Sequence, residues 1–290
     1  MIRGPVMRQL RHVVHAVGRG QRGRLRVNHQ HVGLRLRDPL LQRADLVGGA
    51  QFVLDGGEVK RYAHVFFDLD HTLWDFRANS RETLGELYRD LELEGRGVGS
   101  PAELIEEFEA INDVLWRKYE GGQIDKAVLR VLRFRDTLLR FGVRDDKLAT
   151  RLGSEYLERC PQKKALHAGV PGLLAWLHGR VRMHVITNGF AEVQHVKLKS
   201  SGIEDRFAVV LTSEEAGAKK PDARIFMEAM RRAKATPEGS LMVGDNPYTD
   251  LAGARRVGMD QAHFTGDGAE PDVDATFHFA HFDRLRERLG

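Results

Sequence analysis

The hydrophobic and polar positions divide the chain into three stretches with different periods. Residues 1–58 show no sustained period of 2 or 3.6 and predict no regular element. In residues 78–160 apolar positions recur at helical spacing, which predicts a block of about four helices. From residue 161 onward short apolar runs alternate with helical patterns. The predicted domains are a basic N-terminal extension (1–58), an α/β core (59–77 and 161–290) and a helical domain (78–160).

Short runs rich in β-branched and aromatic residues predict strands buried on both faces, as in a parallel sheet. The predicted strands are 63–67, 181–187, 207–211, 240–244 and, more weakly, 260–264 and 275–279. The predicted helices that alternate with them are 169–178, one that follows the strand 181–187 and ends at about Ser200, 221–235, 248–257 and 281–289. This order predicts an α/β fold, a doubly wound, Rossmann-like parallel sheet with an all-helical domain inserted after its first strand.

Individual residues predict where two of the helices begin. Asn79 or Ser80 can accept a hydrogen bond from a free helical N–H and so cap a helix that ends at about Leu91. Pro221 favours the first position of the helix that ends at about Ala235, because the fixed φ of proline suits that position.

The composition is that of a globular protein, with 42% hydrophobic and 30% charged residues. No apolar run approaches the roughly 18 residues of a membrane helix, so no membrane partner is expected. Cys160 is the only cysteine, which excludes a disulfide framework and a thiolate metal cluster. A reducing, cytoplasmic location is therefore the expectation.

The positive charge of the chain is concentrated in residues 1–58. That segment has ten Arg and no Lys against four acidic residues, a net charge of +6, whereas the whole chain carries +4. Residues 59–290 therefore carry −2, which argues against a nucleic-acid partner for the body of the protein. The segment itself has three interpretations: a basic arm that binds nucleic acid, a targeting peptide, or an over-long start. The third is favoured, with translation beginning near Val59 and the preceding residues disordered or wrongly included.

Polar side chains follow each of the four strong predicted strands. They are Asp68 and Asp70, then Thr187 and Asn188, then Lys219 and Lys220, and last Asp245, Asn246 and Asp250. Two aspartates at i, i+2 also occur where a strand simply ends in a turn, so that pair alone decides nothing. Parallel strands, however, bring their carboxyl ends to one edge of a sheet, where ligands bind. Carboxylates suit a divalent cation, and a lysine and a hydroxyl can hold phosphate oxygens while an aspartate attacks phosphorus.

Four segments carry a resemblance to a known family. They are Asp68-Leu69-Asp70-His71-Thr72-Leu73, Ile186-Thr187-Asn188, Lys220-Pro221-Asp222, and Gly244-Asp245-Asn246 with Asp250. In this order, with a helical insertion after the first, they make residues 62–290 resemble the haloacid dehalogenase superfamily of phosphohydrolases. The resemblance implies a Mg²⁺-dependent phosphomonoesterase that acts through an aspartyl-phosphate, with a C1-type helical cap over its site.

The resemblance also implies a role for each motif residue. Asp68 would be the nucleophile, and Asp70 would protonate the leaving oxygen, deprotonate the attacking water and offer its main-chain carbonyl to the metal. Thr187 and the amide of Asn188 would bind the phosphate, and Lys220, which directly precedes the proline, would balance the charge. The implied metal ligands are Asp68, Asp70 and Asp245, with Asp250 orienting the metal's water or Lys220.

Asp70 also separates two reactions within the superfamily. Its true dehalogenases lack an acid two residues after the nucleophile, since a departing halide needs no proton, so Asp70 favours phosphate transfer. Residues 68–80 and 115–134 look like the pyrimidine nucleotidase branch, which acts on nucleoside 5′-monophosphates. The alternative is a phosphoglycolate- or sugar-phosphate-type phosphatase. A third hypothesis is a non-enzymatic protein that binds nucleic acid through its basic arm.

Several residues of the predicted cap are candidates to contact the leaving group. They are Trp116 and Arg133 first, then Lys118, Tyr119, Lys126 and Phe134. Packing in the helix core is an equal alternative for the aromatic residues, and a solvated position for the charged ones. His71 is a loop residue or a substrate contact, His195 is predicted to be structural, and Trp74 and Phe76 are predicted to wall the cavity. The sequence predicts no oligomeric state.

Overall fold

The computed structural model describes residues 50–53, 59–266 and 273–288. Inside the segment 1–58, where the pattern predicts no element, β1 (Ala50–Val53) forms and pairs antiparallel with β2 (Val59–Tyr62). The three interpretations of the basic segment concern residues that lie outside the described ranges, and they stay predictions.

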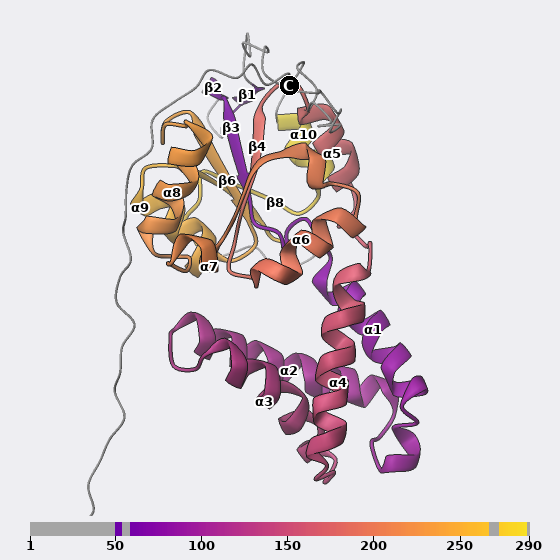
Figure 1. Cartoon of the computed structure of the whole chain (residues 1–290). Helices are drawn as coiled ribbons and strands as arrows, with labels where there is room; N and C mark the ends of the chain where they lie inside the picture. Colours follow the sequence, from indigo (N-terminus) through magenta and orange to yellow (C-terminus); the bar gives the residue numbers. More distant parts are fainter. Residues whose placement is uncertain (1–49, 54–58, 267–272, 289–290) are drawn as a thin grey trace, which may run out of the picture. The chain divides into compact units, whose positions relative to one another are not determined.

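Parallel strands form the main sheet, in the order β5-β4-β3-β6-β7-β8. Their bounds are β3 His64–Phe67, β4 Arg182–Thr187, β5 Phe207–Thr212, β6 Ser240–Gly244, β7 Asp260–Phe264 and β8 Phe277–Phe279. The first strand of this sheet, β3, lies in its middle. The strands β4 and β5 follow on one side of it, and β6, β7 and β8 on the other (Figure 1). This arrangement, with helices on both faces, confirms the predicted fold class.

Helices cover both faces of the sheet because its strands are apolar on both sides. They are α5 (Val170–Leu177), α6 (Ala191–Ser200), α7 (Ser213–Ala216), α8 (Ala223–Ala233), α9 (Ala252–Arg256) and α10 (Phe282–Arg288). Val65 and Phe67 of β3 share a hydrophobic cluster with α5 and α10. Phe66, between them in the strand, shares another cluster with α8 and α9. Figure 1 shows α5 and α10 on one side of the sheet and α8 and α9 on the other. The alternation of side chains along one strand thus anchors both helical layers.

Between β3 and β4 the chain forms a bundle of helices that we call the helical insertion. It consists of α1 (Phe76–Asp90), α2 (Pro101–Glu120), α3 (Lys126–Arg140) and α4 (Asp146–Arg159). The rings of Phe108, Phe134 and Tyr156 meet in its interior, with centroids 5.0 to 5.3 Å apart. In the part of the chain that the structure describes, no helix is both long enough and apolar enough to cross a bilayer.

The predicted start of α1 was wrong. The helix begins at Phe76, and its cap is Asp75, whose carboxylate accepts a hydrogen bond from the N–H of Ala78 at 2.9 Å. Asn79 lies buried inside the helix instead, and its side chain bonds both the carbonyl and the N–H of Ala165, at 2.9 and 3.0 Å. Asn79 therefore ties together the two chain segments that connect the core with the helical insertion, a role that only tertiary contacts reveal.

Two later helices also differ from their predictions. Pro221 does not begin α8: the Lys220–Pro221 peptide bond is cis, and Asp222 caps the helix by accepting from the N–H of Arg224 at 2.9 Å. The predicted helix 248–257 starts as a π-helix (Pro247–Leu251) and continues as α9. The π-helix is capped by the Asn246 side chain, which accepts from the N–H groups of Tyr248 and Thr249.

Candidate active site

The register of β3 brings the predicted site residues to one edge of the sheet. Phe67 pairs with Val185 of β4 on one side and Val243 of β6 on the other. Asp68 follows directly, and its N–H donates to the Val243 carbonyl at 2.9 Å. The residues that follow β4 and β6 therefore lie beside Asp68.

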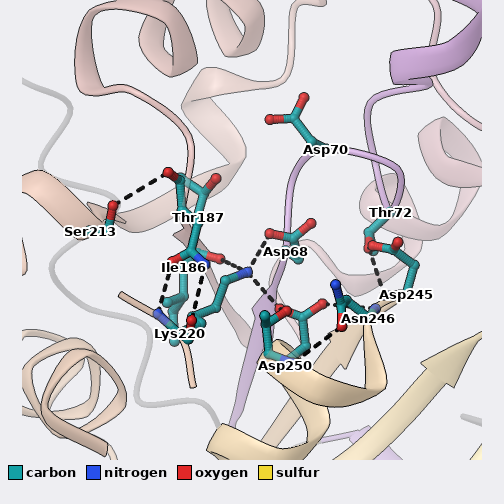
Figure 2. Close-up of polar contacts among 12 residues, drawn as sticks. Asp68, Asp70, Thr72, Ile186, Thr187, Ser213, Lys220, Asp245, Asn246 and Asp250 are labelled. Carbon is teal, nitrogen blue, oxygen red and sulfur yellow. Dashed lines mark hydrogen bonds and ion pairs between the residues drawn. The ribbon is translucent and has the colours of Figure 1, made fainter. Parts of the chain in front are cut away.

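The Lys220 ammonium lies at the centre of the residues gathered at this edge of the sheet. It donates to Asp68 Oδ1 at 2.5 Å and to the Ile186 carbonyl at 3.0 Å, and it pairs with Asp250 Oδ1 at 2.6 Å (Figure 2). Lys220 is 2% exposed. The lysine thus joins the ends of three segments, β3, β4 and the π-helix after β6, with every contact inside the core.

The neighbouring aspartates are also fixed by hydrogen bonds. Asp245 Oδ1 accepts from the Thr72 hydroxyl at 2.8 Å, and the same hydroxyl accepts from the Asp245 N–H at 3.0 Å. Asp250 Oδ2 accepts from the N–H of Asn246 at 3.1 Å. A side chain at Gly244 would collide with the Asp250 carboxylate, so glycine is required at the end of β6 for this approach.

The carboxylates of Asp68, Asp245 and Asp250 form a group whose ligand oxygens lie within 4.8 Å of one another. Burial, followed by repulsion between carboxylates, raises the pKa of Asp245 to about 6. Burial raises the pKa of Asp68 as well, although Lys220 opposes the shift. Three carboxylates with one ammonium leave two negative charges in excess, which fits a divalent cation with oxygen ligands. The Asp70 carboxylate is outside this group, which agrees with the prediction that only its main-chain carbonyl would face the metal, and the Asp250 carboxylate, predicted to orient the metal's water or Lys220, is inside it.

Asp70 faces a different set of partners. Its Oδ1 accepts from Lys197 at 2.5 Å and its Oδ2 from the Gln194 amide at 2.8 Å. Figure 2 shows its carboxylate directed away from Lys220. Burial alone would raise the pKa of Asp70, but the charge and hydrogen bond of Lys197 outweigh it, so the net shift is downward. Asp70 is therefore held as a carboxylate, apart from the acidic group.

Gln194 and Lys197 were missed in the sequence. Both lie on α6, three residues apart, and both are buried. Gln194 also donates to the Thr187 hydroxyl at 2.7 Å, so it connects Asp70 with the end of β4. The available signal was their position on the same helical face as Leu198, where a polar residue and a lysine interrupt the apolar surface.

Thr187 and Asn188 close the other side of the site. The Thr187 oxygen accepts from Gln194 and from the N–H of Gly189, which leaves its own proton free to donate. The Asn188 side chain accepts from the Lys220 N–H at 2.8 Å and donates to the Lys220 carbonyl at 3.1 Å. It therefore fixes the backbone of the lysine loop.

A cavity of about 340 Å³ opens over these residues, between the core and α2 of the helical insertion. Its lining includes Asp68, Asp70, Thr187, Lys220 and Asp245 from the core. From α2 it is lined by Asn112, Asp113, Trp116, Arg117 and Glu120. Glu120 accepts from the Asn188 amide at 3.0 Å, so the insertion contacts a site residue directly.

The residues predicted to contact the leaving group occupy different positions in the structure, and only some of them lie at a cavity. Trp116 lines the cavity, and Arg133 is buried beside a smaller one. Tyr119 and Lys126 instead join the insertion to the core, through Lys219 and through Glu192 with Glu214. Phe134 packs inside the insertion, and Lys118 is exposed.

The remaining candidates are placed as follows. His71 lines the cavity with a left-handed backbone (φ 64°), and its ring contacts that of Phe76 at a tilt of 38°. Phe76 lines the cavity too, whereas Trp74 is fully buried beneath Lys197. His195 is half exposed and lies 3.7 Å from Glu204, away from the site residues.

Comparison with known proteins gives a consistent set of matches. A family model described as haloacid dehalogenase-like hydrolase matches residues 62–258. The pyrimidine 5′-nucleotidase YjjG of Escherichia coli (strain K12) is 32% identical over 197 residues, covering 67% of this chain and 82% of that protein. The pyrimidine 5′-nucleotidase PynA of Streptococcus pneumoniae is 31% identical over 202 residues, covering 69% of this chain and 82% of that protein.

A solved structure matches most of the chain. The putative HAD-hydrolase YfnB from Bacillus subtilis, in a crystal form bound to magnesium, superposes with a TM-score of 0.71 at 25% identity. The match covers 79% of this chain and 99% of that one.

Proposed function

The chain belongs to the haloacid dehalogenase-like hydrolases, as its four motifs predicted, and we propose that it is a Mg²⁺-dependent phosphomonoesterase of nucleoside 5′-monophosphates. One observation carries the proposal. The buried Lys220 ammonium joins the carboxylates of Asp68 and Asp250, while a second acid, Asp70, is held beside them by its own lysine. One carboxylate is thereby set for attack and the other for proton transfer.

Two steps account for the reaction. Lys197 keeps Asp70 a carboxylate before substrate binds, and the negative phosphoryl group of the substrate favours uptake of a proton from water by Asp70. In the first step, an oxygen of Asp68 attacks phosphorus, the bond from phosphorus to the ester oxygen breaks, and Asp70 gives that proton to the ester oxygen. The products are an aspartyl-phosphate and an alcohol. In the second, water attacks the same phosphorus and gives a proton to Asp70, and the acyl phosphate bond breaks to release phosphate and restore Asp68. The Thr187 hydroxyl and the N–H of Asn188 hold phosphate oxygens, and Lys220 offsets the charge of the phosphoryl group.

The residues that would hold the Mg²⁺ are Asp68 and Asp245, with the main-chain carbonyl of Asp70, and Asp250 supports them through Lys220 and Asn246. Bound there, the cation offsets the negative charge of the phosphoryl group and of the acidic group. The excess of negative charge around Lys220 supports this assignment.

The presence of Asp70 favours phosphate transfer over halide displacement. A departing alkoxide needs a proton, and Asp70 borders the cavity beside Thr187 and Gln194. A halide leaves without one, so an acid held there by two side chains would serve no purpose in a dehalogenase. The position of this carboxylate supports the choice of reaction.

The nucleotide part of the proposal rests on the relatives and on the cavity. YjjG and PynA are both described as pyrimidine 5′-nucleotidases. The cavity of about 340 Å³ can hold a leaving group of nucleoside size, and the aromatic rings of Phe76 and Trp116 line it. A planar base can stack on such rings.

A substrate panel tests the proposal. We expect phosphate release from phenyl phosphate and from dUMP, dTMP and dCMP with Mg²⁺, with loss of activity in EDTA and the highest kcat/KM among the nucleotides. No phosphate from any ester, or halide release from a 2-haloacid instead, would contradict the phosphatase assignment. A preference for phosphoglycolate or sugar phosphates would contradict only the choice of substrate.

A further inference from the structure

A second, smaller cavity adjoins the proposed site. It has a volume of about 40 Å³ and shares Asp70, Phe76, Trp116 and Gly189 with the larger one. From there it extends under the helical insertion to Arg133 of α3. Asp70 stands at the boundary of the two cavities, on the side where the leaving group of the proposed reaction must lie.

Arg133 is the unusual residue of this cavity. It is 3% exposed, and no partner among the described residues reaches its Nε or its Nη2 atom. Its guanidinium lies 5.3 Å from the centre of the Phe134 ring and 5.0 Å from that of Tyr156, so aromatic contacts offset part of the cost of burial. A buried arginine whose donors are unpaired is costly, since burial removes water without replacing its hydrogen bonds.

Nε and Nη2 are the two atoms from which arginine donates a pair of hydrogen bonds to a planar acceptor such as a carboxylate. Arg81 donates from Nε and Nη2 to the two carboxylate oxygens of Glu109, at 2.6 and 2.9 Å. Arg231 holds Glu228 through the same two atoms, at 2.7 and 2.8 Å. In Arg133 the same two N–H groups, which we call the Nε–Nη2 fork, have no acceptor among the described residues.

The neighbouring polar groups do not fill the fork. Lys197, the other cation that lines this cavity, forms an ion pair with Asp70. The amide nitrogen of Gln194 is taken by Asp70 and Thr187, which fixes its orientation, and its oxygen is buried without a partner among the described residues. The cavity therefore offers an unused donor pair from Arg133 and one unused acceptor.

We infer that Arg133 binds the far end of the leaving group through oxygen acceptors, and that it determines which phosphomonoesters the enzyme prefers. This inference rests on the proposed phosphatase function and adds the chemistry of the substrate. The acceptor is a carbonyl or carboxylate oxygen: the carbonyl edge of a pyrimidine base, or the carboxylate of a small phosphorylated acid. A ring edge that also carries an N–H would satisfy the Gln194 oxygen, whereas a carboxylate would satisfy the fork alone.

Three variants test this role. Arg133→Met removes the fork but keeps an unbranched side chain of similar length, and Arg133→Lys keeps the charge without the fork. Arg135→Met, on the same helix, removes an exposed arginine whose partner is Asp136 and is the matched control. Each is assayed with dUMP, with phosphoglycolate and with phenyl phosphate, which has no oxygen beyond its phosphate group.

For whichever of dUMP and phosphoglycolate the wild type prefers, we expect Arg133→Met to lower kcat/KM about 10- to 100-fold, mostly through KM. Arg133→Lys should recover only part of this loss, because a single ammonium cannot replace the fork. Activity on phenyl phosphate should stay within about twofold, and Arg135→Met should resemble the wild type throughout. The melting temperature of Arg133→Met without substrate should not fall, since an unpaired buried charge has been removed.

Equal loss on all three substrates, or no loss on any, would overturn the inference. So would a fall in melting temperature that accompanies a uniform loss of activity, because Arg133 would then be structural. These outcomes are separate from failure of the nucleotidase proposal. A wild type that prefers phosphoglycolate, with the loss in Arg133→Met confined to it, supports the role of Arg133 and rejects the nucleotide.

Discussion

Two buried cations, Lys220 and Arg133, line the two adjoining cavities, and they differ in their hydrogen-bond partners. Lys220, on the core side, contacts two carboxylates and a carbonyl. Arg133, on the insertion side, is buried to the same degree, yet its Nε–Nη2 fork has no partner in the described parts of the chain. If the proposed functions hold, the groups for chemistry are assembled before substrate arrives, whereas Arg133, the proposed group for recognition, pairs only with its ligand.

This contrast predicts two kinds of variant. A substitution around Lys220 should lower activity on every phosphomonoester, because all of them carry the same phosphoryl group. A substitution in the helical insertion should change activity according to the leaving group. The following predictions run from the largest expected effect to the smallest.

Asp68→Asn should have the largest effect. The amide cannot form the acyl phosphate, so we expect kcat to fall at least about a thousandfold on every substrate. The measurement is steady-state phosphate release from dUMP and from phenyl phosphate with Mg²⁺. Asp205→Asn, an exposed aspartate, is the control and should be neutral. Turnover near the wild-type value would remove Asp68 from the mechanism.

Lys220→Met should be next. It leaves Asp68 and Asp250 buried without their shared cation, so we expect kcat to fall about a hundredfold or more for all substrates. Its neighbour provides the matched control, because Lys219 donates to the Tyr119 carbonyl of the insertion at 2.5 Å. Lys219→Met should leave kcat within a few-fold and mainly raise KM. Similar losses in kcat for both would mean that the core and the insertion cannot be separated in this way.

Lys197→Met should have an intermediate effect. It removes the charge that holds Asp70 and lowers its pKa, so the acid is no longer kept in one position. We expect kcat to fall about tenfold on both dUMP and phenyl phosphate, measured as initial rates at saturating substrate. Lys199→Met, an exposed lysine of the same helix, should not change kcat. A loss confined to one substrate would place Lys197 with the recognition groups.

Glu192→Gln should have the smallest effect. Glu192 of α6 pairs with Lys126 at 2.8 Å and with Arg130, both from α3 of the insertion. Because these charges are partly exposed, we expect only a rise in KM of about two- to fivefold, with kcat unchanged. A fall in kcat of tenfold or more would mean that this contact is part of the assembled chemistry.

The same contact has a defined pH dependence. Burial alone would raise the pKa of Glu192, but the hydrogen bonds from Lys126 and Arg130 hold it at about 2. This pKa is below the ordinary value of 4.5. The contact therefore keeps its full strength above about pH 4.5 and weakens as the pH falls from 4.5 toward 2. The KM ratio of Glu192→Gln to wild type should therefore be constant from pH 5 to 8.

By itself the sequence determined the parallel sheet, its helical insertion and the edge where the chemistry gathers. These follow from local patterns: short apolar runs form buried strands, and the ends of parallel strands meet. The four motifs followed from the same strand ends, so Asp68, Thr187, Lys220 and Asp245 could be named before any contact was known. The starts of α1 and α8 were missed because a neighbouring aspartate caps each helix in place of the predicted residue.

Only the tertiary structure decided what surrounds Asp70 and Arg133. Asp70 and Lys197 are 127 residues apart. Their contact depends on how α6 places Lys197 over the Trp74 ring in the segment after β3, which no period in the chain encodes. The same holds for Asp250, whose carboxylate joins the acidic group because Gly244 leaves room for it. Whether a buried polar atom has a partner depends on all the segments around it, so the empty fork of Arg133 became visible only in three dimensions.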